Sequence, residues 1–230
     1  MNQNYVLKLV IIKEEIFYQI DMQTTIIKNW AIGTTPQSLK RIHEDKINIA
    51  IYKRDTSAFV NEINHLLEQN ITFKSSGDID TILSAITEII NPKKHGFIIQ
   101  DIKRLLYTFK EVTDVNNFRL LLATVNTNMC KKFHTDINTL RMLCTYSGAG
   151  TLWLTDDNIN RKALILNKEN IAIQENEVRQ VKTGNVAILK GGMYPDTTNA
   201  VIHRSPTIEA TSEKRLLLRI DMNESLNLWI

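Results

Sequence analysis

In the first half of the chain, apolar residues recur at three- and four-residue intervals, the spacing of one face of an α-helix. Three segments with this pattern are predicted to be helices: 57–67, 78–90 and 96–110. Pro92 follows the second segment and cannot continue a helix. A short β-branched run at 47–52 predicts a strand. The first 114 residues are therefore expected to be mainly helical, with short strands.

From about residue 115 the pattern changes to short β-rich runs separated by turns. Eight runs are predicted to be strands: 118–125, 140–146, 151–154, 163–166, 171–173, 186–189, 200–203 and 215–221. Many short strands at close spacing are typical of a barrel or sandwich. We therefore expect one α+β domain in which a β-barrel, residues 115–230, is buttressed by the helices of residues 1–114.

Two histidines and an aspartate form the clearest chemical pattern. His134 and Asp136 are two residues apart, so in an extended strand both side chains point to the same side. His203 lies far along the chain and must be brought alongside by the fold. Two imidazoles and a carboxylate can occupy one face of an octahedral metal, as in non-haem Fe(II) sites. We predict that the three side chains bind one divalent metal ion.

Cysteine could change the metal at this site. In an unbroken strand Cys130 would share the face of His134, and a thiolate ligand would favour zinc over iron. Cys130 is therefore a possible extra ligand, and a buried structural thiol is the alternative. Cys144 lies in an apolar run and is expected to pack in the core. The remaining histidines have no partner pattern and are expected at the surface: His43, His65 and His95.

The last predicted strand carries two arginines on one face, because alternation groups Arg215, Leu217 and Arg219. An arginine inside an apolar barrel is costly unless it pairs with an anion, and its planar group suits a carboxylate. Arg215 is the first candidate to bind a carboxylate and Arg219 the second. The alternative for Arg215 is a place at the surface, or a pair with Asp221 or Glu213.

Four further residues are candidates for the wall of a substrate pocket: Arg141, Tyr146, Trp153 and Arg204. Arg141 shares a predicted strand face with Leu143 and Thr145. The two aromatic residues flank a glycine-containing turn, and aromatic residues at a barrel mouth often line ligand pockets, although they also occur in ordinary cores.

Composition and charge limit the kinds of partner and the cellular compartment that we expect. Hydrophobic residues make up 43% and charged residues 23%, which is ordinary globular composition. The net charge of +3 is spread along the chain, so nucleic acid is not an expected partner. No apolar run approaches the ~20 residues that span a bilayer, so no membrane partner is expected. Two cysteines and a start without the features of a secretory signal favour the cytoplasm.

The order of His-x-Asp, a long gap, His and then Arg resembles the iron- and 2-oxoglutarate-dependent oxygenases of the double-stranded β-helix fold. The resemblance covers about residues 115–222. It implies a jelly-roll or cupin-like barrel in which His134, Asp136 and His203 hold Fe(II). It also implies that Arg215 holds the distal carboxylate of 2-oxoglutarate, and that the substrate is a small molecule or a protein side chain.

Four sequence blocks are similar to a more specific family, the bacterial domain of unknown function 1826. They are CKKFHTD at 130–136, RMLCTY at 141–146, GAGTLW at 148–153 and HRSP at 203–206, in the same order as in the family. Leu152 departs from the pattern, which has glutamate there. This resemblance supports the barrel and the site but implies no substrate.

Three functions remain open on the sequence alone. The first is an Fe(II)- and 2-oxoglutarate-dependent dioxygenase of the hydroxylase type, which we predict. The second is a non-enzymatic zinc protein for metal handling or sensing, which would use Cys130. The third is a cupin-type metal enzyme without 2-oxoglutarate. The fold cannot choose among them, because such barrels host many chemistries.

Overall fold

The structure is a computed structural model that describes residues 28–195, 200–209 and 213–223. Its main element is a seven-stranded sheet in the order β1-β2-β8-β5-β10-β4-β3. Only β1 and β2 run parallel, and the other neighbouring strands are antiparallel. The strands are β1 (Trp30–Gly33), β2 (Ile49–Tyr52), β3 (Thr72–Gly77), β4 (Phe118–Val125), β5 (Leu140–Ser147), β8 (Val186–Lys190) and β10 (Arg215–Met222).

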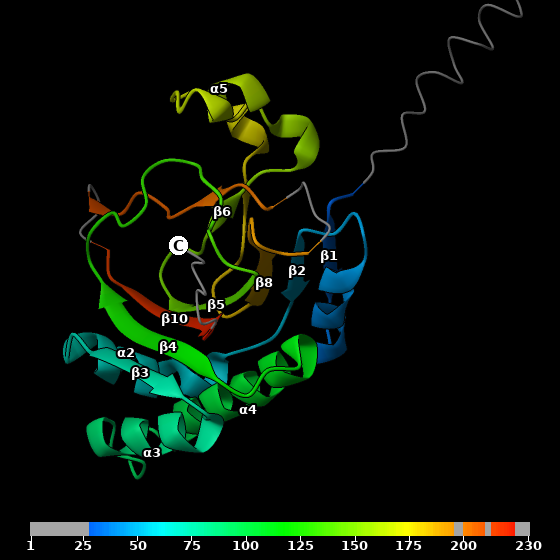
Figure 1. Cartoon of the computed structure of the whole chain (residues 1–230). Helices are drawn as coiled ribbons and strands as arrows, with labels where there is room; N and C mark the ends of the chain where they lie inside the picture. The colour runs from blue at the N-terminus through cyan, green and yellow to red at the C-terminus, as the bar shows by residue number, and fades with distance from the viewer. Residues whose placement is uncertain (1–27, 196–199, 210–212, 224–230) are drawn as a thin grey trace, which may run out of the picture.

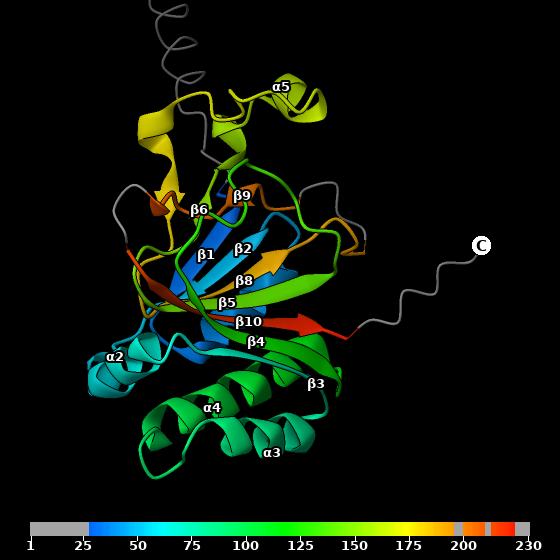
Figure 2. The same cartoon turned by 90° about the vertical axis from the view of Figure 1, so that its left-hand side faces the viewer.

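Three helices cover one face of this sheet, as Figure 1 and Figure 2 show. They are α2 (Val60–Glu68), α3 (Ile79–Ile89) and α4 (Gly96–Thr113), and two 3-10 turns, η1 (Pro36–His43) and η2 (Ser57–Phe59), precede them. The helix α3 begins where Asp78 accepts a hydrogen bond from the backbone N–H of Thr81. The largest apolar cluster lies between the helices and the sheet and includes Ile98, Phe109 and Leu122. All three predicted helices are confirmed.

A smaller sheet faces the other side of the large one, above it in Figure 2. It has the order β7-β6-β9 and consists of β6 (Leu152–Trp153), β7 (Arg179–Gln180) and β9 (His203–Arg204). A second apolar cluster includes Leu143 and Leu217 from the large sheet together with Trp153 from the small one. Apolar side chains therefore fill part of the space between the two sheets.

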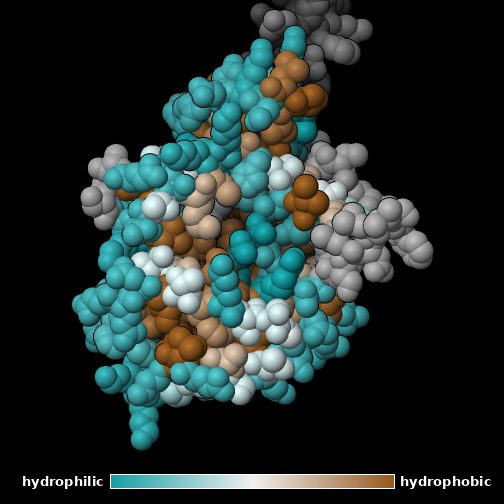
Figure 3. Space-filling view, turned by 60° about the vertical axis from the view of Figure 1, so that its left-hand side comes forward, coloured by the Kyte–Doolittle hydropathy of each residue, from teal (hydrophilic) through white to brown (hydrophobic). Residues whose placement is uncertain are grey.

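A lobe extends beyond the small sheet, at the top of Figure 1. It contains η3 (Asp156–Asn158), α5 (Arg161–Ile165) and η4 (Glu175–Glu177) and has a small core of its own around Leu154, Ile159 and Ala163. Figure 3 shows one face of the molecule, where hydrophilic residues cover the left of this upper part and hydrophobic ones gather along its right-hand side. No helix among the described residues is long and apolar enough to cross a membrane.

Several predicted strands differ from those in the structure. The prediction for 163–166 was wrong, because Asn160 caps the helix α5 there by accepting from the backbone N–H of Ala163. The run at 171–173 contributes only one bridge, between Ala172 and Ile159. Strands β1 and β3 form the two edges of the large sheet, so the sheet is not confined to residues 115–230 as predicted. The chain is thus a mixed α/β protein with a large, mostly antiparallel sheet.

Candidate metal centre

His134, Asp136 and His203 converge, although the first two lie far from the third in the chain. One possible ligand atom from each lies within 4.8 Å of the other two. The Nε2 of His203 is 3.3 Å from one carboxylate oxygen of Asp136, and the Nε2 of His134 is 3.7 Å from the other. Atoms bound at about 2 Å to the same ion lie about 3–4 Å apart, so the spacing suits a single metal ion.

Main-chain hydrogen bonds bring the two histidines together. The N–H of His134 donates to the carbonyl of His203 and the N–H of His203 donates to the carbonyl of His134, both at 3.0 Å. The expected continuous strand is not formed, because His134 makes only this one bridge and Asp136 lies in a loop. The N–H of Gly192 holds that loop by donating to the carbonyl of Asp136 at 2.8 Å.

Both imidazoles are oriented with Nε2 toward the carboxylate. The Nδ1 of His134 lies 2.9 Å from the carbonyl of Lys132, and the Nδ1 of His203 lies 3.4 Å from the carbonyl of Val201. A carbonyl can only accept, so each Nδ1 carries a proton and Nε2 is the ring nitrogen left to face a metal. This is the usual outer support of a metal-binding histidine. The donor set therefore fits a divalent metal ion.

Arg141 holds the carboxylate of the site in place. Its Nη1 lies 2.5 Å from Asp136, and its Nε lies 2.6 Å from Asp221, which also contacts Arg219 at 3.0 Å. Burial alone would favour the neutral acid, but the two histidines and the charge of Arg141 outweigh it and hold the pKa of Asp136 well below its ordinary value. The carboxylate is therefore ionised and ready to bind a cation.

Arg215, at the start of β10, has the opposite environment. The residue is 1% exposed, and its guanidinium donates one side-chain hydrogen bond, from Nη2 to the Thr145 hydroxyl at 3.3 Å. Among the described residues Nε has no partner, and no carboxylate lies close enough to form an ion pair. Burial lowers the pKa of Arg215 to about 10, and the charge of Glu213 only partly offsets this effect. Among the described residues the guanidinium is thus a buried cation without an ion-pair partner.

The histidines and Arg215 line the same cavity. It also contains Arg141, Arg204 and Arg219 from the predicted set, together with the exposed Cys130. Its enclosed space is narrow, about 60 Å³. The half-buried Arg204 and Arg219 are long side chains in its wall, and a bound organic acid would have to displace part of that wall.

The family model described as "Protein of unknown function (DUF1826)" matches residues 33–221. The chain belongs to this family. The four sequence blocks all lie within the matched range, so the predicted resemblance to the family is confirmed. No curated protein sequence matches the chain.

Three solved structures illustrate what this DUF1826 chain is similar to. A Pseudomonas putida prolyl-4-hydroxylase has 9% identity, a TM-score of 0.44, and coverage of 81% of this chain and 92% of its own. A full-length Neurospora crassa protein in complex with alpha-KG has 12% identity, a TM-score of 0.43, and coverage of 82% and 78%. The Fe(II)/(alpha)ketoglutarate-dependent dioxygenase TqaL has 12% identity, a TM-score of 0.44, and coverage of 81% and 85%. These likenesses are too distant to assign an activity.

Two aromatic residues predicted for the pocket do not line this cavity of the DUF1826 chain. The prediction for Tyr146 was wrong, because its side chain faces the helices and its hydroxyl donates to Asp101 at 2.6 Å. Trp153 is 2% exposed and packs against Trp30, with ring centroids 5.8 Å apart. Strand alternation explains the first error: Thr145 faces Arg215, so Tyr146, one residue on, faces away.

Other sequence expectations have mixed outcomes. Cys144 is buried as predicted, and burial raises the pKa of its thiol to about 11. His95 is not at the surface, because it is 2% exposed. Its Nε2 lies 2.7 Å from the Nδ1 of His65. Cys130 is outside the group of three converging ligand residues.

Asp221 is the site residue that the sequence reasoning missed. It was considered only as a partner of Arg215, whereas it binds Arg141 and Arg219. The signal was present in the sequence, because alternation along β10 puts Asp221 on the same face as both arginines of that strand. An acid on a face that carries two arginines is expected to pair with an arginine.

Proposed function

We propose that the protein is an Fe(II)- and 2-oxoglutarate-dependent dioxygenase in which His134, Asp136 and His203 hold the metal. One observation carries the proposal: the two histidines of the converging His-Asp-His group line the same cavity as Arg215, a buried cation with no ion-pair partner among the described residues. We further propose that the two facing sheets form a double-stranded β-helix around this cavity. The names of the distant structural neighbours agree with the proposal but do not support it independently.

The donor set favours iron over a zinc-handling role. Two imidazole nitrogens and one carboxylate oxygen leave three positions of an octahedral ion open for other ligands. A closed structural zinc site would need a fourth protein ligand, and the exposed Cys130 is not part of the converging group. The expected role of the site is therefore to bind reactants beside the metal.

Arg215 is the proposed anchor for the distal carboxylate of 2-oxoglutarate. A guanidinium can bind both oxygens of a carboxylate, and burial strengthens such a pair because little water competes. Thr145 already orients the Nη2 end of this group. Binding of a dianion would also supply the counter-ion that Arg215 lacks among the described residues.

The bound metal and cosubstrate would supply oxidation of a substrate C–H bond: 2-oxoglutarate, O₂ and R–H give succinate, CO₂ and R–OH. The chain's own residues bind and orient the reactants. The carbonyls of Lys132 and Val201 fix the histidine rings, and Arg141 fixes the carboxylate. The apolar residues between the sheets keep water from the rest of the interior.

Anaerobic calorimetry with Fe(II) and 2-oxoglutarate tests this proposal. We expect one iron per chain, and 2-oxoglutarate binding that requires the metal. Asp136→Ala should abolish both. Arg215→Met should keep the iron and weaken 2-oxoglutarate by about 2–5 kcal/mol, or about 30-fold or more, because a buried charge pair is lost. Arg161→Met, which removes an exposed arginine from the lobe, is the matched control and should change neither.

The alternatives give different results in the same experiment. Metal binding with no affinity for 2-oxoglutarate would contradict the proposal and favour a cupin-type metal enzyme. Retention of zinc that is lost in Cys130→Ser would favour a zinc-handling protein. Activity is then sought as succinate formation from 2-oxoglutarate, which many oxygenases of this chemistry would show as a slow background reaction without their substrate.

A further inference from the structure

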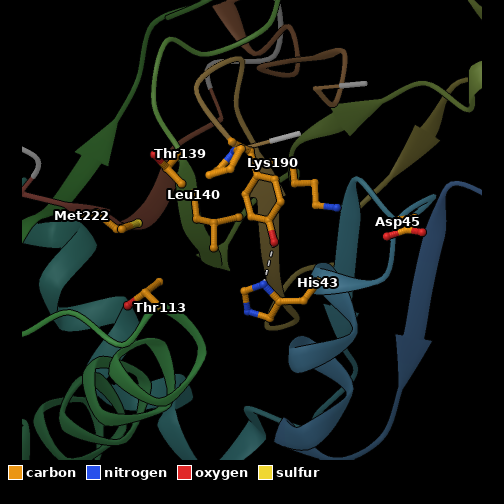
Figure 4. Close-up of a pocket in the computed structure, with 9 residues that line it drawn as sticks. His43, Asp45, Thr113, Thr139, Leu140, Lys190 and Met222 are labelled. Carbon is orange, nitrogen blue, oxygen red and sulfur yellow. Dashed lines mark hydrogen bonds between the residues drawn. The ribbon is translucent and has the colours of Figure 1, made fainter. Parts of the chain in front are cut away.

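A second cavity, of about 430 Å³, lies on the helix-covered side of the large sheet (Figure 4). Its wall includes Leu140 from the start of β5 and Lys190 from the end of β8. Leu140 belongs to the core cluster under the helices, whereas Arg141, one residue on, lines the metal cavity. The two cavities are therefore on opposite faces of the same sheet.

Lys190 brings a buried positive charge to this second cavity. The residue is 2% exposed, and its Nζ donates to the carbonyl of Glu44 at 3.1 Å. Among the described residues it makes no ion pair, so two of its three N–H donors are left without a protein acceptor. Burial lowers the pKa of Lys190, although the charge of Asp45 acts in the other direction. The group would gain from an anion in the cavity.

Tyr194 forms an ordered wall beside this charge. The carbonyl of Val112 can only accept, so the Nε2–H of His43 donates to it at 2.8 Å. The Nδ1 of His43 must then accept from the Tyr194 hydroxyl, at 2.7 Å, and the dashed line in Figure 4 marks this bond. The Nζ of Lys190 lies 4.5 Å from the centre of the Tyr194 ring. The ring is thus fixed at its tip, with its face toward the ammonium group.

The rest of the wall is partly apolar and partly polar, with Thr113 and Asp45 among its polar residues. Leu140, Met222 and Pro195 contribute hydrocarbon surface, and the threonine Thr139 adds a hydroxyl. The volume lies within the range of about 300–1,000 Å³ that is typical of small-molecule sites. A lysine with no role beyond packing would be costly here, because an apolar side chain would fill the same space without burying a charge.

We propose that this cavity binds a small organic monoanion, with its carboxylate against Lys190 and its apolar body between Leu140, Met222 and the Tyr194 ring. Among the described residues Lys190 is the one lysine or arginine in the wall, and Asp45 disfavours ligands of higher negative charge such as phosphate. The inference goes beyond the proposed dioxygenase function, because it requires neither metal nor 2-oxoglutarate.

Titration of the metal-free full chain with benzoate, followed by NMR, tests this site. Benzamide has nearly the same shape without the charge and serves as the matched ligand. We expect benzoate to bind at least about tenfold more tightly than benzamide, because a charge-assisted hydrogen bond is lost with the amide. Lys190→Met should remove this preference, whereas Lys182→Met, at an exposed lysine, should leave it unchanged.

A second variant covers the case in which Lys190→Met does not fold. Met222→Trp places a larger side chain at the half-buried edge of the cavity, and it should block benzoate while Lys190 is kept. Excess 2-oxoglutarate should not displace benzoate, which separates this site from the metal cavity. Equal affinities for benzoate and benzamide, tighter binding of inorganic phosphate, or unchanged binding in Met222→Trp would overturn the proposal.

Discussion

Each face of the large sheet buries the side chain of an arginine, and the two arginines differ in their partners. On the helix-covered face, Nη1 and Nη2 of Arg54 bind the two carboxylate oxygens of Asp101 at 2.5 and 2.8 Å. Its Nε donates to the carbonyl of Gly184 at 2.8 Å. On the face toward the small sheet, Arg215 has one hydroxyl contact and, among the described residues, no carboxylate.

The protonation of the two groups reflects this difference. Burial disfavours the charge of Arg54, but its neighbours, Asp101 among them, outweigh this effect and raise the pKa above its ordinary value. Burial lowers the pKa of Arg215 because no comparable partner is present among the described residues. A buried arginine whose guanidinium is paired with a carboxylate stabilises the fold. A buried arginine without such a partner lowers stability until an anionic ligand binds. The comparison therefore separates a structural cation from one that we propose to bind a ligand.

The largest expected effect comes from breaking the structural pair. Asp101→Ala would leave Arg54 buried without its carboxylate and Tyr146 without its acceptor. We expect a loss of about 3–5 kcal/mol in the free energy of unfolding, measured by urea denaturation. Glu88→Ala, at an exposed helix position, is the control and should change stability by less than about 0.5 kcal/mol. If both variants cost equally little, Arg54 is not structurally important.

An effect of intermediate size is expected for Arg141, which is paired with two acids on the face toward the small sheet. Arg141→Met would remove the group that holds Asp136 and would leave two acids without their shared partner. We expect metal affinity to fall by about 10–100-fold, as for other outer-shell partners of metal ligands. Competition with a coloured chelator measures it, and the exposed Arg104→Met is the control. Unchanged affinity would mean that Asp136 keeps its orientation without Arg141.

The smallest effect should have the opposite sign to the first. Arg215→Met removes a buried charge that has no ion-pair partner among the described residues, so the metal-free protein should become more stable by about 1 kcal/mol. The same urea denaturation measures it. A clear loss of stability would show that Arg215 has a structural partner, and the contrast with Arg54 would then disappear.

Much of the metal centre could be predicted because side-chain alternation is a local property. The alternation that grouped Arg215, Leu217 and Arg219 is found in the cavity wall. Convergence of His203 with His134 and Asp136 could not be derived from spacing alone, since it depends on a contact between distant segments. For that contact the prediction rested on the four family blocks, because periodicity describes only local structure.

The errors lie where local pattern and tertiary context disagree. The four residues at 163–166 are apolar enough for a strand, but short apolar runs cannot be told from helix by periodicity, and the cap at Asn160 decides for helix. Strand β3 was missed because it is polar, with Phe73 its one buried residue. Such an edge strand has little hydrophobic signal and is fixed by pairing with β4.

The reciprocal main-chain bonds between His134 and His203 have a consequence for how an ion would be chosen. The two histidines that supply the nitrogen donors are joined by one pair of main-chain hydrogen bonds. The separation of the two nitrogens is therefore set when the chain folds, before any ion binds. The oxygen donor is held separately, by Arg141 and by the bond from Gly192 to its loop. An ion whose radius suits this prearranged set of donors would be captured with little reordering of the chain.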